Sequence, residues 1–236
     1  MPSPEDRVLQ LARRGPVTAR DLAGIGVPRA HLQRLCARGD LVRVERGVYR
    51  SADAETTELA SVAEVAKRAP RVVICLLTAL QIHGLTTEVP HEVWVLIHNR
   101  ARTPHIERPH LHVVRASGEA ATYGVEVRTI EGVDVRVTSP AKTVADCFRY
   151  RDHVGLDVAL AALRDYRRKG RGKATSVERR VRGTGAGFGY GSGAGAGNGD
   201  GSGYGDPWFF SVDALVEAAR ADRVYSVVRP YLEALA

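Results

Sequence analysis

Apolar residues recur at helical spacing in three short segments near the start of the chain. The first segment spans residues 4–15, and Thr18 can cap a short second helix with its side-chain hydroxyl. A Gly-Ile-Gly turn at residues 24–26 permits a sharp reversal before the third segment, residues 28–39. Pro28 suits the first turn of that segment because it has no amide hydrogen to lose. The pattern predicts a helix-turn-helix unit preceded by one further helix.

The third predicted helix has two faces of different chemistry. At about 100° per residue, Leu32, Leu35 and Cys36 fall on one side. The opposite side is small, basic and amide-bearing, which suits close approach to the major groove, where Gln can pair with adenine and Arg can fork onto guanine or a phosphate. We therefore predict that this is a DNA recognition helix. The outer face consists of Ala30, Gln33, Arg34, Ala37 and Arg38.

A strand-like alternation follows the third helix and predicts a hairpin. Residues 41–45 and 48–50 would be its strands, with the turn at residues 46–47. The hairpin favours a winged helix-turn-helix over a small trihelical core whose surface arginines are merely solvated. The hairpin side chains available to the core are Leu41, Val44 and Val48. The predicted DNA-contacting residues are Arg29, Gln33, Arg34, Arg38, Arg43, Arg46 and Arg50, of which the last three would line the wing.

Charge and composition favour a polyanionic partner. Residues 1–50 hold ten arginines against five acidic residues, and the 236-residue chain has a formal net charge of +7. Positive charge at this density suits counterion release from phosphates, although net charge alone does not separate nucleic acid from an anionic membrane. No apolar run approaches the ~20 residues of a membrane span, and the N-terminus lacks a signal-peptide core. We expect a cytoplasmic protein that binds double-stranded DNA and no membrane, with its three cysteines reduced.

The rest of the chain predicts a second, larger domain, so the expected fold class is α+β. β-rich runs separated by Pro, Gly and charged residues indicate a small, mostly antiparallel sheet. Ser139 and Pro140 start one helix well, and a further helix runs from Leu156 to Arg168. Two terminal helices follow, and Pro230 predicts a kink or a break in the last one. The remaining expected helices span residues 55–67 and 78–85, and the expected strands span residues 72–75, 93–97, 111–114, 125–130 and 133–137.

Two segments of unusual composition separate this domain from the terminal helices. Residues 164–182 hold nine basic residues against two acidic ones, and this run either contacts DNA backbone or RNA, or is a solvated helix end that complements the helix dipole. From residue 183 to 206, glycine alternates with small, polar or aromatic residues. Burial could not recover the entropy cost of ordering such a backbone, so we expect a disordered insertion that acts as a passive linker.

Few side-chain combinations suit metal binding or catalysis. The closest candidates for a metal site are His105, His110 and His112, but no cysteine accompanies them and two prolines break the segment. Lys142, Asp146 and Arg149 lie four and three residues apart, so an intrahelical ion-pair ladder explains them. The chain has no Walker loop, no dinucleotide fingerprint and no Asp…Glu-x-Lys nuclease cluster. We expect no metal, no cofactor and no enzymatic activity.

Three blocks of the sequence resemble the AbiEi family of type IV toxin–antitoxin antitoxins, which are also transcriptional autorepressors. Residues 41–50 look like the family's wing, which ends in Gly-x-Tyr, and residues 78–85 are similar to its small-Ala-Leu-x-x-His-Gly-Leu helix. Residues 137–148 are similar to a third block, which is followed by a Gly-Leu-Asp helix and, after the insertion, by residues 229–233. The wing motif alone is moderately specific, whereas all three blocks in order are much more so.

The resemblance implies an N-terminal winged helix that binds repeats in its own promoter, expected to be inverted repeats, and a C-terminal domain that neutralises a partner toxin. In this family the toxin is usually a nucleotidyltransferase-like protein encoded nearby, and direct contact with it is not required. The resemblance assigns the antitoxin-domain motif to His83, Gly84, Lys142, Thr143 and Asp146. The alternative is a nuclease-related or RNA-binding protein in which the winged helix is a targeting module.

The expected division of the chain follows from these patterns. It comprises a winged helix-turn-helix domain at residues 1–52, an α+β antitoxin-like domain at 53–182, the disordered glycine-rich insertion at 183–206, and terminal helices at 207–236 that pack on the antitoxin-like domain.

Overall fold

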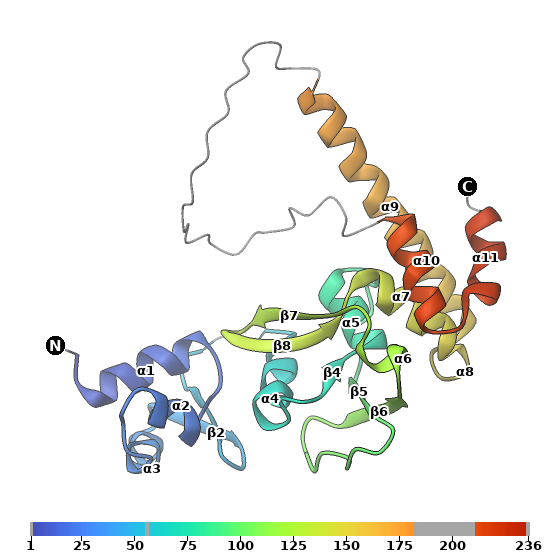
Figure 1. The fold of residues 1–236 in the computed structure, drawn as a ribbon. Helices are drawn as coiled ribbons and strands as arrows, with labels where there is room; N and C mark the ends of the chain where they lie inside the picture. The colour runs from blue at the N-terminus through green and yellow to red at the C-terminus, as the bar shows by residue number, and fades with distance from the viewer. Residues whose placement is uncertain (1, 55–56, 182–210, 235–236) are drawn as a thin grey trace, which may run out of the picture.

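Two units lie side by side in the computed structural model, which describes residues 2–54, 57–181 and 211–234 (Figure 1). We call residues 2–54 the N-terminal unit, and residues 57–181 together with 211–234 the second unit. The architecture is mixed α/β, with a three-stranded sheet in the first and a five-stranded sheet in the other. The glycine-rich insertion predicted at residues 183–206 lies outside the described residues.

The N-terminal unit consists of the predicted helices and hairpin, with one additional short strand. Ser3 caps the first helix by accepting a hydrogen bond from the Asp6 amide (3.1 Å), and Asp21 accepts bonds from the amide and hydroxyl of Thr18 (2.8 Å each) in front of the second. Gly39 ends the third helix in the left-handed conformation, at φ 82°. The elements are α1 (Pro4–Arg14), β1 (Val17–Thr18), α2 (Ala19–Gly24), α3 (Ala30–Arg38), β2 (Leu41–Glu45) and β3 (Val48–Ser51), and the antiparallel sheet has the order β1-β3-β2.

One apolar cluster holds the three helices against this sheet. Leu35 of α3 and Leu22 of α2 are fully buried, and each such side chain stabilises the unit by ~1.5–3 kcal/mol relative to its exposed state. Because Leu32 and Leu35 face this cluster, the other side of α3 is turned outward. The buried members are Val8, Ala12, Val17, Leu22, Val27, Leu32, Leu35 and Leu41.

The second unit places a five-stranded sheet between helices. Its first elements are α4 (Ala60–Arg68), β4 (Val73–Ile74), α5 (Leu76–His83), β5 (Val93–His98) and β6 (Leu111–Ala116). They are followed by α6 (Glu119–Thr122), β7 (Val125–Ile130), β8 (Val133–Thr138), α7 (Pro140–Arg149) and α8 (Arg151–Val154). The last elements are α9 (Leu156–Val181), α10 (Val212–Ala221) and α11 (Tyr225–Ala234). In the described part of the chain, no helix combines the length and the apolar character needed to cross a bilayer.

The larger sheet is mixed, so the expectation of a mostly antiparallel sheet is wrong. Its strand order is β6-β5-β4-β8-β7, with β5 and β6 parallel, β4 and β8 parallel, and the other two pairs antiparallel. Only β7 and β8 are joined by a tight turn, so their antiparallel pairing follows from the sequence. The parallel pairs depend on longer connections, including the whole segment between β4 and β8, which carry no local signal of strand direction.

Each face of this sheet has its own core. Along β5, Val93, Val95 and Ile97 point into the cluster with α4, whereas Trp94 and Leu96 point into the cluster with α5, α7 and α9. Helices α10 and α11 complete the second cluster with their apolar side chains. These are Leu215, Ala218, Ala219 and Val228.

Two helices differ from their predicted extent. Helix α9 continues to Val181, beyond its expected end near Arg168, and Pro230 lies inside α11 without ending it. Pro230 is the sixth residue of the ten in α11, beyond the four amides that have no partner in the helix, so it removes one intrahelical hydrogen bond.

Ion pairs and one close backbone contact join the two units. Among the residues that the structure describes, three pairs cross the boundary, each between side chains less than a quarter exposed: Asp21–Lys67 at 2.8 Å, Glu45–Arg68 at 3.0 Å and Arg50–Glu131 at 3.2 Å. Gly15 packs so closely on the Glu131 carbonyl that a Cβ atom at position 15 would overlap it. These contacts hold the N-terminal unit in one orientation on the second unit.

Candidate nucleic-acid interface

Helix α3 presents a polar, unobstructed face on the N-terminal unit. Gln33, Arg34 and Arg38 are exposed, whereas Leu32 and Leu35 on the opposite side are buried. Arg29 precedes the helix and is also exposed. The structure therefore places the predicted base-reading side chains together on one accessible helix face.

A carboxylate that sequence analysis did not single out holds the α3 arginines in place. Glu5 of α1 lies 2.5 Å from Arg38 and 3.5 Å from Arg34, and His31 reaches the same carboxylate at 3.5 Å. Partial desolvation raises the pKa of Glu5, but Arg38, His31 and Arg34 together lower it by more, so the net shift of this pKa is downward. Arg34 and Arg38 remain 60% and 53% exposed, so these contacts orient both guanidinium groups while leaving them open to a phosphate or a base edge.

The hairpin exposes two of its three predicted arginines. Arg43 in β2 and Arg46 in the turn are both exposed, and Gly47, the second turn residue, adopts φ 79°. Val44 is 37% exposed, so its predicted place in the core is wrong. The strand register shifts between Arg43 and Glu45, and this bulge turns the Val44 side chain outward.

Arg50 does not belong to the exposed wing. It is 7% exposed and pairs with Glu131 of the second unit at 3.2 Å, a contact between residues 81 positions apart in the sequence. The predicted DNA contact by Arg50 is therefore wrong. Side chains along β3 alternate between the two faces of the sheet, and Arg50 lies on the face opposite to Arg43. Its side chain therefore points into the boundary between the two units.

Of the motif residues of the second unit, His83, Lys142, Thr143 and Asp146 are buried, whereas Gly84 is exposed. The His83 imidazole hydrogen-bonds through Nε2 to the Thr138 carbonyl at 2.6 Å, and burial lowers the pKa of His83 to about 3, so the ring is neutral. Gly84 ends α5 at φ 61°, and the Lys169 ammonium donates to the adjacent His83 carbonyl at 2.7 Å. Thr143 hydrogen-bonds to the carbonyl oxygens of Thr138 and Ser139. These groups fasten α5, β8 and α7 together.

A buried cation joins two carboxylates at the centre of this junction. Lys142 is fully buried, and its ammonium contacts the Asp146 carboxylate and lies 2.7 Å from Asp222, which follows α10. One cation cannot neutralise two buried carboxylates, so desolvation and the nearby Asp222 raise the pKa of Asp146 to about 8. Arg149 donates to the Asp222 backbone carbonyl at 2.6 Å. The predicted intrahelical ion pair of Lys142 and Asp146 is thus present, but it is buried and shared with Asp222, and Arg149 binds the Asp222 backbone instead of extending the ladder.

The other predicted candidates are dispersed. His112 stacks on Trp94 with ring centroids 3.7 Å apart, whereas the His105 side chain is 92% exposed. Within the described residues, no three His, Cys, Asp or Glu side chains gather closely enough to hold a metal ion. Cys75 and Cys147 are buried free thiols whose pKa values are raised by burial, and Cys36 is a half-buried free thiol. In the basic run, side chains are described only to residue 170, and there Lys169 binds the end of α5.

Sequence comparison identifies the N-terminal unit. Residues 6–52 match the family model described as AbiEi_4: Transcriptional regulator, AbiEi antitoxin, which confirms the resemblance to AbiEi antitoxins over the N-terminal unit. A search of curated protein sequences gave no match. Among solved structures, the chain is similar to the RV2827C protein from Mycobacterium tuberculosis, with 16% sequence identity and a TM-score of 0.44 over 63% of this chain and 61% of that one.

Three functional partners were not apparent in the sequence pattern. Glu5 looked like an ordinary acidic residue of the first helical turn, and Asp222 lies 80 residues from the lysine that it binds. Arg68 ended an unremarkable helix, although it pairs with Glu45 of the wing. None of the three has a local sequence signal, because each acquires its role through a contact distant in sequence.

Proposed function

We propose that this chain is a DNA-binding autorepressor in which α1 to α3 and the β-hairpin act as a winged helix. The observation that carries the proposal is the exposed face of α3, where Gln33, Arg34 and Arg38 lie together above a leucine underside. The match of residues 6–52 to AbiEi-type transcriptional regulators supports the same conclusion. The inferred ligand is double-stranded DNA upstream of the protein's own coding sequence, with inverted repeats as the expected operator.

The exposed side chains suggest a division of labour on that DNA. In the proposed complex, α3 enters the major groove, where the amide of Gln33 suits an adenine edge and the guanidinium groups of Arg34 and Arg38 suit guanine. Arg29, at the start of the helix, and Arg43 and Arg46, in the hairpin, contact phosphate or the minor groove. The contacts with bases supply sequence preference, and the phosphate contacts supply affinity that depends on salt.

We also propose that the second unit supports an antitoxin activity against a nucleotidyltransferase-like toxin encoded nearby. The AbiEi domain supports this assignment. Because His83, Lys142 and Asp146 are buried, they would act by shaping the second unit rather than by contacting a toxin. This is compatible with neutralisation that needs no stable complex.

Footprinting on the upstream DNA tests the repressor function. Replacing Arg34 and Arg38 together (R34A/R38A) should abolish operator protection and weaken binding at least ~30-fold, since each base-reading arginine contributes ~1–3 kcal/mol of discrimination. A matched variant, R220A/R229A, loses the same charge from exposed positions on α10 and α11 and should protect the operator normally. Thermal melting of both variants confirms that they are folded.

Growth rescue by the same variants tests the antitoxin function. When the adjacent toxin is expressed, R34A/R38A should still restore growth, because its substitutions lie in the N-terminal unit. Unchanged operator protection by R34A/R38A contradicts the assignment of α3, and absence of rescue by the wild-type protein contradicts the antitoxin function.

A further inference from the structure

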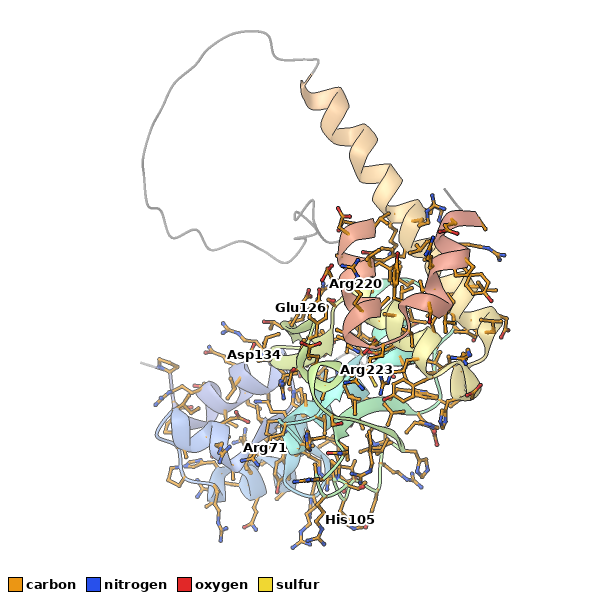
Figure 2. All side chains as sticks on the ribbon, turned by 45° about the vertical axis from the view of Figure 1, so that its right-hand side comes forward. Arg71, His105, Glu126, Asp134, Arg220 and Arg223 are labelled. Atoms are coloured by element: carbon orange, nitrogen blue, oxygen red, sulfur yellow. The ribbon has the colours of Figure 1, made fainter. Side chains whose placement is uncertain are left out.

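The connection between β5 and β6 is a second basic, exposed element. Residues 99–110, which we call the basic loop, contain Arg100, Arg102 and Arg108 and a single acidic residue, Glu107. All three arginines are exposed. The loop lies on the same side of the molecule as α3 and the hairpin turn (Figure 1), and Figure 2 shows His105 at its outer edge.

One guanidinium group fixes the basic loop beside the wing. Arg68 of α4 pairs with the Glu45 carboxylate in β2 at 3.0 Å and donates to the His105 backbone carbonyl in the loop at 3.2 Å. A single guanidinium spans both contacts, so the end of β2 and the middle of the loop are neighbours. The Arg68 guanidinium also offsets the negative charge of Glu45, so this carboxylate repels a nearby phosphate less.

The basic loop is held in a defined shape before any ligand binds. Arg115 of β6 donates to the backbone carbonyls of Asn99 (3.0 Å) and Ala101 (2.8 Å) and to the Thr103 hydroxyl (2.9 Å). Ile106 packs against the apolar cluster under α4. A braced loop loses less conformational entropy on binding than a free one, so its arginines are available at low cost.

From this placement we infer that the basic loop is a second DNA-contacting element, which binds phosphates of the duplex next to the segment contacted by the wing. The inference rests on the proposed function, because the duplex that α3 and the hairpin bind is the one that passes the loop. The basic loop is suited to contact with the DNA phosphate backbone and not with base edges. It carries three guanidinium groups on an irregular segment, without the regular spacing of a helix that lies in a groove. The second unit thus takes part in DNA binding and lengthens the protected site on the wing side.

The salt dependence of binding to upstream DNA measures this contribution. Each arginine that neutralises a phosphate adds about 0.9 to the slope of log affinity against log salt. The triple variant R100A/R102A/R108A should therefore lower the slope by about 2–3 and shorten the footprint on one flank, while sequence preference is retained. The charge-conserving variant R100K/R102K/R108K should restore most of the slope, because lysine also neutralises a phosphate.

A matched control separates the loop from a general loss of positive charge. The variant R220A/R223A/R229A removes three exposed arginines from the terminal helices and their connection; Figure 2 shows Arg220 far from His105. It should keep the wild-type slope and footprint. Circular dichroism melting of each variant establishes that it is folded before binding is measured.

The outcomes distinguish the loop from the proposed function. If the wild-type protein binds with strong salt dependence and the loop variant has the same slope and footprint, the inference is overturned and the winged-helix proposal stands. If the control variant loses as much slope as the loop variant, the inference is also overturned, since the effect then comes from net charge. If the wild-type protein shows no salt-sensitive binding, both proposals fail.

Discussion

The two units place their charged side chains in opposite environments. In the N-terminal unit, Arg34 and Arg38 are more than half exposed and share a surface carboxylate, Glu5. In the second unit, Lys142 has no exposed side-chain surface and lies between Asp146 and Asp222. Burial thus separates charged side chains that are accessible to a ligand from those that hold a core together.

This difference has an energetic basis. Exposed ion pairs contribute little to stability because water and salt screen them, so the arginines of α3 can exchange Glu5 for a DNA phosphate at small cost. A buried lysine must keep its partners, because an unpaired charge in the core is far more expensive than the pair. Asp222 supplies one of these partners from beyond the insertion, and it thereby ties α10 to α7.

The largest expected effect comes from removing the buried cation. The variant Lys142→Met leaves Asp146 and Asp222 without their cation and should lower the free energy of unfolding by about 3–5 kcal/mol. Urea denaturation followed by circular dichroism measures this loss. The triple variant K142M/D146N/D222N, in which no charge remains, should recover part of it. Wild-type stability for Lys142→Met alone would show that the triad does not hold the second unit together.

Local signals in the sequence were sufficient for the N-terminal unit. Its helices end at glycines or begin at capping residues, and its hairpin turns at a glycine with φ 79°, so each boundary is determined by neighbouring residues. The leucine stripe of α3 correctly predicted the buried side of the helix. The Val44 bulge escaped prediction because a shift in register depends on the partner strand.

Long-range contacts account for what the sequence did not reveal. The parallel pairing of β4 with β8 joins strands about 60 residues apart, as the register Ile74 to Val137 shows, and alternation of apolar residues is the same for either direction. The buried partner of Lys142 lies across the insertion. For the candidate interface, Arg46 and Arg50 looked alike, and only the position of Glu131 in the folded chain distinguishes them.

Arg50 and Arg46 offer a direct test of the contrast between buried and exposed charge. The variant Arg50→Ala leaves Glu131 in the boundary between the units with the Thr57 hydroxyl as a remaining partner at 2.7 Å. It should lower the free energy of unfolding by about 2–3 kcal/mol. The matched variant Arg46→Ala should change stability by less than about 0.5 kcal/mol and reduce the salt slope of DNA binding by about 1. The contrast would break down if Arg46→Ala destabilised the protein as much as Arg50→Ala.

The smallest predicted effect is a pH dependence that belongs to the second unit. The pKa of Asp146 is raised from 3.8 to about 8, so the folded protein holds a proton that the unfolded chain releases. The stability that this proton provides is complete below pH 3.8 and is lost as the pH rises toward 8. The pKa of His83 is lowered from 6.5 to about 3, so the stability linked to its neutral ring is lost as the pH falls from 6.5 toward 3.

These two dependences oppose each other between pH 3.8 and 6.5 and should nearly cancel there. Above pH 6.5 only the proton on Asp146 makes stability depend on pH. The free energy of unfolding should then fall by about 1.4 kcal/mol per pH unit up to pH 8. In the N-terminal unit, partial burial raises the pKa of Asp21, but Lys67 and the hydrogen bonds from Thr18 together lower it by more, so the stability linked to this carboxyl has the opposite pH dependence. Urea denaturation across this range should show that Asp146→Asn flattens the alkaline slope. His83→Gln should instead uncover the Asp146 dependence between pH 3.8 and 6.5, so that stability falls there as the pH rises. Unchanged slopes in both variants would mean that neither buried group titrates differently in the folded and unfolded states.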